Sequence, residues 1–148
     1  MTNFYLLRHG DAEPGSGIRD RERRLTPGGV GDVLRQARAH LERGERIGAI
    51  LCSPYIRAQQ TANLVNGLLK TSLEIVSDLT PSGNVQKVMD RLMGSEEDVL
   101  LVTHLPLVAD LAEALTRTRI AFFPGTCAKI NCGDPIRLDG TLVWVHHP

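Results

Sequence analysis

The 148-residue chain carries 17 lysine and arginine residues against 17 aspartate and glutamate residues, so its formal net charge is zero at pH 7. Proteins that bind the nucleic-acid backbone need clustered excess basic side chains, and the balanced charge argues against that class. No apolar run approaches the roughly 20 residues that cross a bilayer, and the amino terminus lacks the pattern of a signal peptide. We therefore expect a cytoplasmic protein with a single domain over residues 1–148 and with neither nucleic acid nor membrane among its partners.

The first predicted element is a buried strand that ends in two reactive side chains. Residues 4–7 are apolar without alternation, which is typical of a parallel strand covered on both faces. Arg8, His9 and Gly10 follow directly. Because parallel sheets form their ligand crevice at the carboxyl ends of the strands, Arg8 and His9 are candidates for chemistry.

A densely charged segment and a helix come next. Residues 18–24 contain four arginines and two acidic residues, a pattern that usually forms a solvated surface, although one of its arginines can turn towards an anion. Thr26 and Pro27 are typical of an N-cap and a first helical position. Apolar residues at helical spacing over 30–41 predict a helix with one face on the sheet. His40 lies beside this stripe, and we expect it on the surface at the end of the helix.

The pattern of strand, reactive residue and helix recurs twice. Residues 47–52 form an apolar strand before Ser53–Pro54, a second cap-and-proline start, and Arg57 falls in the first turn of the expected helix. Free N–H groups and the helix dipole favour an anion at such a place. Residues 99–103 form another apolar strand, which ends at His104 before a further helix. A sheet can bring the ends of these strands together.

The remaining segments complete an α/β pattern. We expect a short strand at 73–76, a helix at 85–93 after a turn or cap element, and strands at 126–131 and 141–146, with the histidines at 146–147 as a terminal tail. The last two strands add one or two antiparallel strands at an edge of the sheet. The prediction is a compact three-layer α/β/α domain with a mostly parallel sheet and no sizeable lid insertion.

The three cysteines are predicted to be free. They have neither CxxC nor zinc-finger spacing. Cys52 lies in an apolar strand, where a free cysteine normally packs in the core. Cys127 and Cys132 are an odd number of positions apart, so on one strand they face opposite sides of the sheet, and we expect no disulfide between them.

Two kinds of ligand suit histidines beside arginines. A metal fits poorly, because the fixed positive charge opposes a cation and no third histidine or carboxylate has obvious ligand spacing, although Asp11 and Asp78 are nearby possibilities, so we predict no metal and no cofactor. Phosphate fits well, because its oxygens accept forked guanidinium contacts. Neighbouring positive charge also lowers the pKa of a histidine and keeps it neutral near pH 7. A neutral histidine can attack phosphorus and form a covalent phosphohistidine while arginines stabilise the developing charge.

These motifs resemble those of the histidine phosphatase superfamily, which includes the phosphoglycerate mutases. They are most similar to its smallest branch, the bacterial SixA-type phosphohistidine phosphatases. The matching segments, in the order of the family, are RHGDA at 8–12, RRLTPGG at 23–29, CSPYIRAQQT at 52–61, LTPSGN at 79–84 and THLPLV at 103–108. The chain departs from the family pattern at Arg24, where relatives often have proline, and at Asn84, where aspartate is common.

The resemblance implies a role for each residue of the pocket. It makes His9 the phosphorylated nucleophile, Arg8 and Arg57 phosphate-binding residues, and His104 the residue that completes the pocket. Arg23 matches an arginine that precedes Leu-Thr in the family and by this resemblance also reaches the phosphate. The implied activity is that of a metal-independent phosphatase acting on phosphohistidine in a protein.

The resemblance leaves the substrate and the proton donor open. The partner is expected to be a histidine phosphotransfer domain or a phosphocarrier protein, and the chain is expected to act as a monomer. A small-molecule phosphomonoesterase or mutase of the same superfamily and a non-catalytic phosphate-binding module remain alternatives. Most relatives carry a carboxylate donor on an insertion for which this chain has no room between Arg57 and His104. Asp11, Glu13 and Asp78 are nearby acids, and none has a motif that assigns it.

Overall fold

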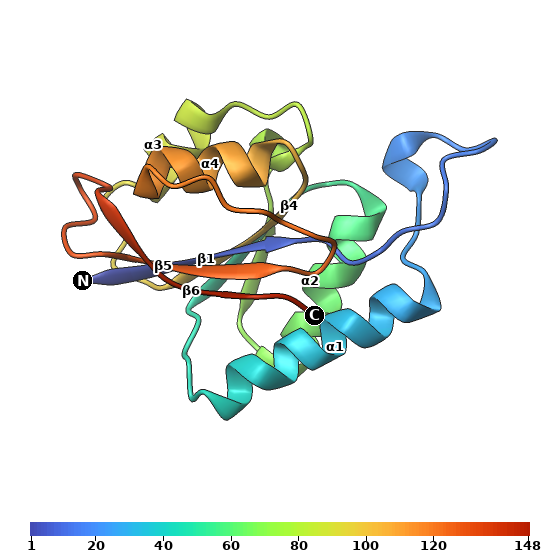
Figure 1. The fold of residues 1–148 in the computed structure, drawn as a ribbon, viewed down its shortest axis with the longest axis horizontal. Helices are drawn as coiled ribbons and strands as arrows, with labels where there is room; N and C mark the ends of the chain where they lie inside the picture. Colours follow the sequence, from blue (N-terminus) through green and yellow to red (C-terminus); the bar gives the residue numbers. More distant parts are fainter.

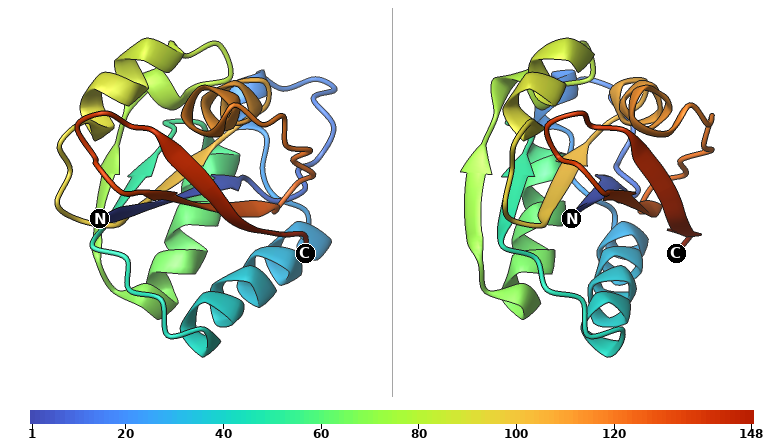
Figure 2. Two further views of the ribbon diagram at one scale, coloured as in Figure 1. Left: turned by 60° about the vertical axis from the view of Figure 1, so that its left-hand side comes forward. Right: turned by 90° about the vertical axis from the view of Figure 1, so that its left-hand side faces the viewer.

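The computed structural model describes all 148 residues, which form a six-stranded sheet between two pairs of helices (Figures 1 and 2). The strands are β1 (Thr2–Arg8), β2 (Ala49–Cys52), β3 (Ser72–Ile75), β4 (Val99–Thr103), β5 (Cys127–Cys132) and β6 (Gly140–His146). The α-helices are α1 (Pro27–Glu42), α2 (Ile56–Leu69), α3 (Val85–Leu92) and α4 (Leu107–Thr116). Two short 3₁₀ helices, η1 (Asp20–Glu22) and η2 (Ser77–Leu79), lie in the connections.

The sheet has the order β3-β2-β4-β1-β5-β6. The first four strands of this order pair in parallel, whereas β5 runs antiparallel to both β1 and β6. Arg8 is in register with Thr103, and Cys52 with Val102. The predicted fold is therefore confirmed, and the carboxyl ends of β1, β2 and β4 lie level at one edge of the sheet.

Both faces of the central strands are covered. Phe4 and Leu6 of β1 belong to a core on the side of α3 and α4, while Tyr5 and Leu7 belong to a second core under α1 and α2. Figure 2 shows the helices in these two layers. Full burial of such side chains contributes about 1.5–3 kcal/mol each, which explains why β1 is apolar without alternation.

The cysteines lie as their spacing predicts. Cys52 and Cys127 pack in the core under α1 and α2, Cys132 packs in the opposite core, and all three are free and buried.

The prediction for His40 was wrong, because its side chain is completely buried. Its ring lies 5.2 Å from that of Tyr5 and 5.8 Å from that of Trp144, centre to centre. Trp144 comes from β6, so the imidazole is enclosed by a strand that lies far away in sequence. Burial lowers the pKa of His40 to about 4.

Two further local predictions need correction. The last histidines do not form a free tail: His146 ends β6 and its Nδ1 lies 2.7 Å from Oε1 of Gln36 in α1, and Nδ1 of His147 lies 2.8 Å from Oγ1 of Thr126. Helix α2 begins at Ile56, so Ser53 is not its N-cap. The cap predicted at Thr26 is present, since its hydroxyl accepts the N–H of Gly29. No helix in the fold is long and apolar enough to cross a membrane.

Candidate active site

The side chains singled out in the sequence meet at the carboxyl edge of the parallel strands. Arg8 ends β1 and His9 follows it, Arg57 lies in the first turn of α2 after β2, and His104 follows β4. The rings of His9 and His104 are 4.9 Å apart, centre to centre, and Nε of Arg57 lies 3.2 Å from Nε2 of His9. The fold thus gathers two imidazoles and two guanidinium groups from three strand ends.

His9 is held as a neutral imidazole that carries a lone pair on Nε2. Its Nδ1 lies 2.7 Å from the carbonyl oxygen of Gly10. Since a carbonyl only accepts, Nδ1 carries the hydrogen, and Nε2 accepts the Nε–H of Arg57. The pKa of His9 is lowered to about 4, first by burial and then by the charges of Arg57 and Arg8. The direction was predicted from the neighbouring charges, but burial is the main cause.

Gly10 allows the end of β1 to pass close to α1. A Cβ atom at this position would lie 2.8 Å from Cγ2 of Val33 and 3.0 Å from the carbonyl oxygen of Gly29. The N–H of Gly10 donates to Oγ1 of Thr61 in α2 at 3.1 Å. A larger residue here would push apart β1 and the helix, and with them the carbonyl that orients His9.

Arg8 offers an unused donor inside the site. Its Nη1 donates to the carbonyl oxygen of Phe122 at 3.0 Å, whereas its Nε is buried without a hydrogen-bond partner. An unpaired buried donor costs about 1–3 kcal/mol. An oxygen atom of a bound anion would satisfy it.

Arg57 is almost fully engaged by its neighbours. Its side chain is 5% exposed, its Nη1 donates to the backbone oxygen of Asp20 at 2.6 Å, and its Nη2 lies 3.2 Å from Oδ2 of the same residue. Its Cζ lies 5.1 Å from the centre of the Tyr55 ring. These contacts fix the plane of the guanidinium and direct Nε towards His9.

His104 presents one satisfied and one unsatisfied nitrogen. Its Nε2 lies 2.7 Å from Oγ of Ser53, and its Nδ1 is buried without a partner. The pKa of His104 is lowered to about 3, first by burial and then by its neighbours His9 and Arg57. The ring is therefore neutral at pH 7.

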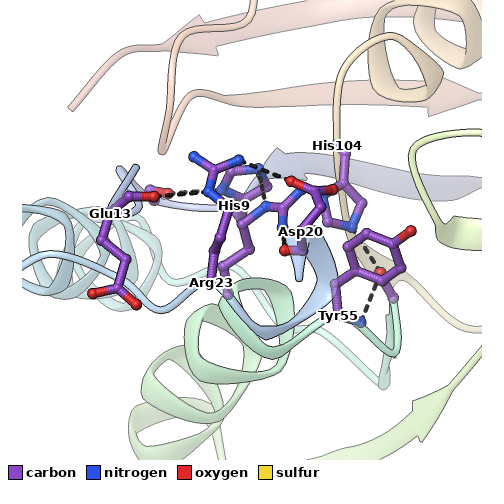
Figure 3. Close-up of polar contacts among 9 residues, drawn as sticks. His9, Glu13, Asp20, Arg23, Tyr55 and His104 are labelled. Carbon is purple, nitrogen blue, oxygen red and sulfur yellow. Dashed lines mark hydrogen bonds and ion pairs between the residues drawn. The ribbon is translucent and has the colours of Figure 1, made fainter. Parts of the chain in front are cut away.

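Arg23 reaches the edge of the site, where Figure 3 shows it beside Glu13 and Asp20. Asp20 links it to Arg57. Its Nε donates to the backbone oxygen of Glu13 at 2.7 Å and its Nη1 to Oδ1 of Asp20 at 3.0 Å. The other carboxylate oxygen of Asp20 pairs with Arg57. The pKa of Asp20 is lowered, first by its hydrogen bond with Arg23 and also by Arg57, so Asp20 is a carboxylate at pH 7.

Two of the acids nominated from the sequence have hydrogen-bond partners outside the histidines and arginines of the site. Oδ2 of Asp11 accepts the hydroxyl of Thr26, and Oε1 of Glu13 accepts the N–H of Arg24. Asp78 lies in η2. No three histidine, cysteine or carboxylate side chains converge in the arrangement of metal ligands.

A pocket of about 450 Å³ adjoins the site between η1 and the start of α2. It is lined by Arg21, Glu22, Pro54, Tyr55, Ile56 and Thr80. Its wall includes Tyr55, whose ring lies 5.0 Å from that of His104. The pocket can therefore receive groups attached to a phosphate bound between the histidines and arginines.

Sequence reasoning missed Asp20 and Ser53. Asp20 is one of several charged residues in the segment 18–24, and its only local signal is its position three residues before Arg23. Ser53 was predicted as a helix cap. Its contact with His104 spans 51 positions of the sequence and depends on the pairing of β2 with β4.

Comparisons with known proteins agree on one family. Residues 4–81 match the family model described as the histidine phosphatase superfamily (branch 1). The chain is 34% identical to the phosphohistidine phosphatase SixA homolog of Haemophilus influenzae, over 86% of this chain and 87% of that protein. It is 33% identical to phosphohistidine phosphatase SixA of Escherichia coli, over 97% and 92% of the two chains. It also resembles the structure of the protein histidine phosphatase SixA complexed with tungstate, with a TM-score of 0.91, 30% identity, and coverage of 99% of this chain and 97% of that one.

Proposed function

Because the chain belongs to the histidine phosphatase superfamily, we propose that it is a phosphatase that removes phosphate from phosphohistidine in a protein. The observation that carries this proposal is the neutral His9, whose Nε2 lone pair lies beside the guanidinium of Arg57 in a buried site. A neutral imidazole among cations is a suitable nucleophile for a phosphoryl group.

The first half of the reaction transfers the phosphoryl group to His9. The oxygens of the phosphoryl group bind Arg8 and Arg57. One of them accepts the hydrogen bond that the Nε–H of Arg57 otherwise donates to Nε2 of His9. Nε2 then attacks phosphorus, the P–N bond to the substrate imidazole breaks, and the electron pair of that bond leaves with the imidazole, which carries a proton on its other ring nitrogen and departs as a neutral molecule. The guanidinium groups stabilise the charge that develops on the phosphoryl oxygens.

The second half returns the enzyme to its starting state. A water molecule attacks phosphorus of phospho-His9, the P–Nε2 bond breaks, and inorganic phosphate forms. His9 regains its lone pair while Nδ1 keeps its hydrogen bond to Gly10. Neither half requires a metal, because Arg8 and Arg57 supply the positive charge, with Arg23 at the rim.

The ionisation of the carboxylate beside the arginines favours a phosphohistidine substrate over a phosphate ester. An alkoxide leaving group has a conjugate acid of pKa about 15, like water's, and needs a general acid worth about 10²–10⁴-fold. Imidazole has a pKa of about 6.5 and leaves with little help. Asp20 is the carboxylate that contacts the arginines, and its lowered pKa leaves it without a proton to donate at pH 7.

The experiment is a comparison of kcat/KM between a phosphorylated histidine phosphotransfer domain or phosphocarrier protein and small esters such as phosphoglycerate and a sugar phosphate. We expect the protein substrate to be favoured at least about a hundredfold, the lower end of a general-acid contribution. His9→Ala protein corrects for spontaneous hydrolysis. Equal efficiency on an ester would favour the phosphomonoesterase or mutase. Phosphate binding without turnover of either class would favour a binding module.

We also propose the setting in which this reaction takes place. The pocket beside Tyr55 adjoins the histidines and arginines of the site, which suits a side chain that protrudes from a folded partner. The partner is a histidine phosphotransfer domain or a phosphocarrier protein in the cytoplasm, and the enzyme acts on it as a monomer.

A further inference from the structure

Ser53 forms the only hydrogen bond that the imidazole of His104 makes within the protein. Both residues are buried, with exposed fractions of 0% and 1%. Oγ of Ser53 lies 2.7 Å from Nε2 of His104, and it also accepts the backbone N–H of Tyr55 at 3.2 Å. The N–H of Ser53 itself donates to the carbonyl oxygen of Val102 in β4 at 3.0 Å. Ser53 is therefore anchored to the strand that carries His104.

These contacts decide which nitrogen of His104 carries the hydrogen. A serine hydroxyl has one hydrogen and two acceptor positions. If Nε2 of His104 donated to Oγ, both partners of Oγ would be donors, and the hydroxyl hydrogen would be buried without an acceptor. If the hydroxyl donates to Nε2, the hydroxyl hydrogen, Oγ and Nε2 are all satisfied, and only Nδ1 of His104 is left without a partner within the protein. The second arrangement places the hydrogen of the neutral imidazole on Nδ1.

Nδ1 is also the nitrogen that lies buried without a partner. The ring of His104 is 4.9 Å from that of His9, centre to centre, so this imidazole borders the place where phosphorus must approach Nε2 of His9. An N–H group there attracts a phosphoryl oxygen, whereas a bare lone pair would repel it. The hydrogen bond at one ring nitrogen thus decides what the other nitrogen offers to the ligand.

We propose that Ser53 is a positioning residue that holds His104 as the Nδ1–H tautomer, so that Nδ1 donates a hydrogen bond to a phosphoryl oxygen during transfer. The identity of the ligand as a phosphoryl group rests on the proposed function. The tautomer of His104 is argued from the hydrogen bonds of Ser53 alone. Ser53 acts on the substrate through His104 and does not touch it.

The direct test is ¹⁵N NMR of His104 at pH 7 in the wild type, in Ser53→Ala and in Thr103→Val. Thr103→Val is the matched control, because it removes a buried hydroxyl that donates to Leu79 and makes no contact with an imidazole. We expect a protonated Nδ1 and a bare Nε2 in the wild type and in Thr103→Val, and loss of this single tautomer in Ser53→Ala. A hydrogen on Nε2 of His104 in the wild type would overturn the proposal, and this measurement needs no variant.

Kinetics provide the second readout. We expect Ser53→Ala to lower kcat by about 10- to 100-fold, by analogy with the loss of groups that orient a metal-binding histidine, with a smaller change in KM. Binding of inorganic phosphate should weaken as well, and Ser53→Thr, which keeps the hydroxyl, should restore both. An unchanged kcat in folded Ser53→Ala protein would contradict the proposal while leaving the phosphatase assignment intact. If the wild type turns over no phosphohistidine but Ser53→Ala loses both the tautomer and phosphate binding, the proposed function fails and the role of Ser53 stands.

Discussion

Arg57 donates the hydrogen of its Nε to Nε2 of His9 across 3.2 Å. The contact directs a cation at the nitrogen that attacks phosphorus in the proposed mechanism, and that attack would require the Nε–H of Arg57 to switch its hydrogen bond from Nε2 to a phosphoryl oxygen. The two remaining nitrogens of Arg57 are bound by the backbone oxygen and the carboxylate of Asp20. A phosphoryl group that uses both edges of Arg57 must therefore compete with Asp20.

Asp20→Asn should strengthen inhibition by inorganic phosphate. The substitution removes a negative charge that is shared by Arg23 and Arg57 and repels an anion. Since the Asp20 side chain is 58% exposed, we expect only about a two- to fivefold lower inhibition constant, as for other exposed ion pairs. Asp32→Asn is a suitable control, because Asp32 forms a similar pair with Arg35 three residues on. Weaker inhibition in Asp20→Asn would show that the carboxylate supports anion binding.

The two arginines paired with Asp20 should differ in their contribution to catalysis. Arg57→Lys loses the planar fork and the Nε–H that faces His9, and we expect kcat/KM to fall by about 10²–10³-fold. Arg23→Lys should cost about tenfold or less, because the Arg23 side chain is 27% exposed and its contacts are with Glu13 and Asp20 rather than His9. Arg35→Lys, at an exposed position, serves as the control. A larger loss of kcat/KM in Arg23→Lys than in Arg57→Lys would show that Arg23 contacts the phosphate directly.

The residues at the strand ends could be predicted because the signal is local. Unbroken apolar runs in β1 and β4 identify buried parallel strands, and such strands end at a shared edge, so Arg8, His9 and His104 follow from their positions in the sequence. Arg57 follows from the helix start after β2. The family motifs then added the role of each residue.

The parts that could not be predicted depend on contacts between distant segments. Ser53 has the sequence context of a helix cap, and only the alignment of β2 with β4 brings it to His104. Asp20 lies in a charged run that resembles a solvated surface until the segment folds over Arg57. His40 was expected at the surface because its helix gives no sign of Trp144, which covers it from β6.

The acidic limb of the pH profile should lie near the lowered pKa of His9. Nε2 is nucleophilic only when unprotonated, and burial lowers the pKa of His9 to about 4. We expect kcat/KM to be flat between about pH 5 and 7 and to fall tenfold per pH unit below about 4. A limb centred near 6.5, the ordinary pKa of histidine, would show that His9 is not desolvated.

The folded fraction must be followed by circular dichroism across the pH profile, because acid also lowers the stability of the folded protein. His9, His40 and His104 all have lowered pKa values in the folded state. As the pH is lowered, these histidines therefore bind protons at a higher pH in the unfolded chain than in the folded protein. The free energy of unfolding falls as the pH drops from about 6.5 towards 4. Rates should be normalised to the folded fraction at each pH.

The most direct test of the account is to stop the reaction within its first turnover, using a phosphohistidine protein that carries ³²P, and to locate the label. We predict acid-labile, base-stable phosphate on His9, attached to Nε2, because Nδ1 is occupied by its hydrogen bond to Gly10. His9→Ala should carry no label and lose turnover by several orders of magnitude. Label on Nδ1 or on another residue, or full activity of His9→Ala, would contradict the account.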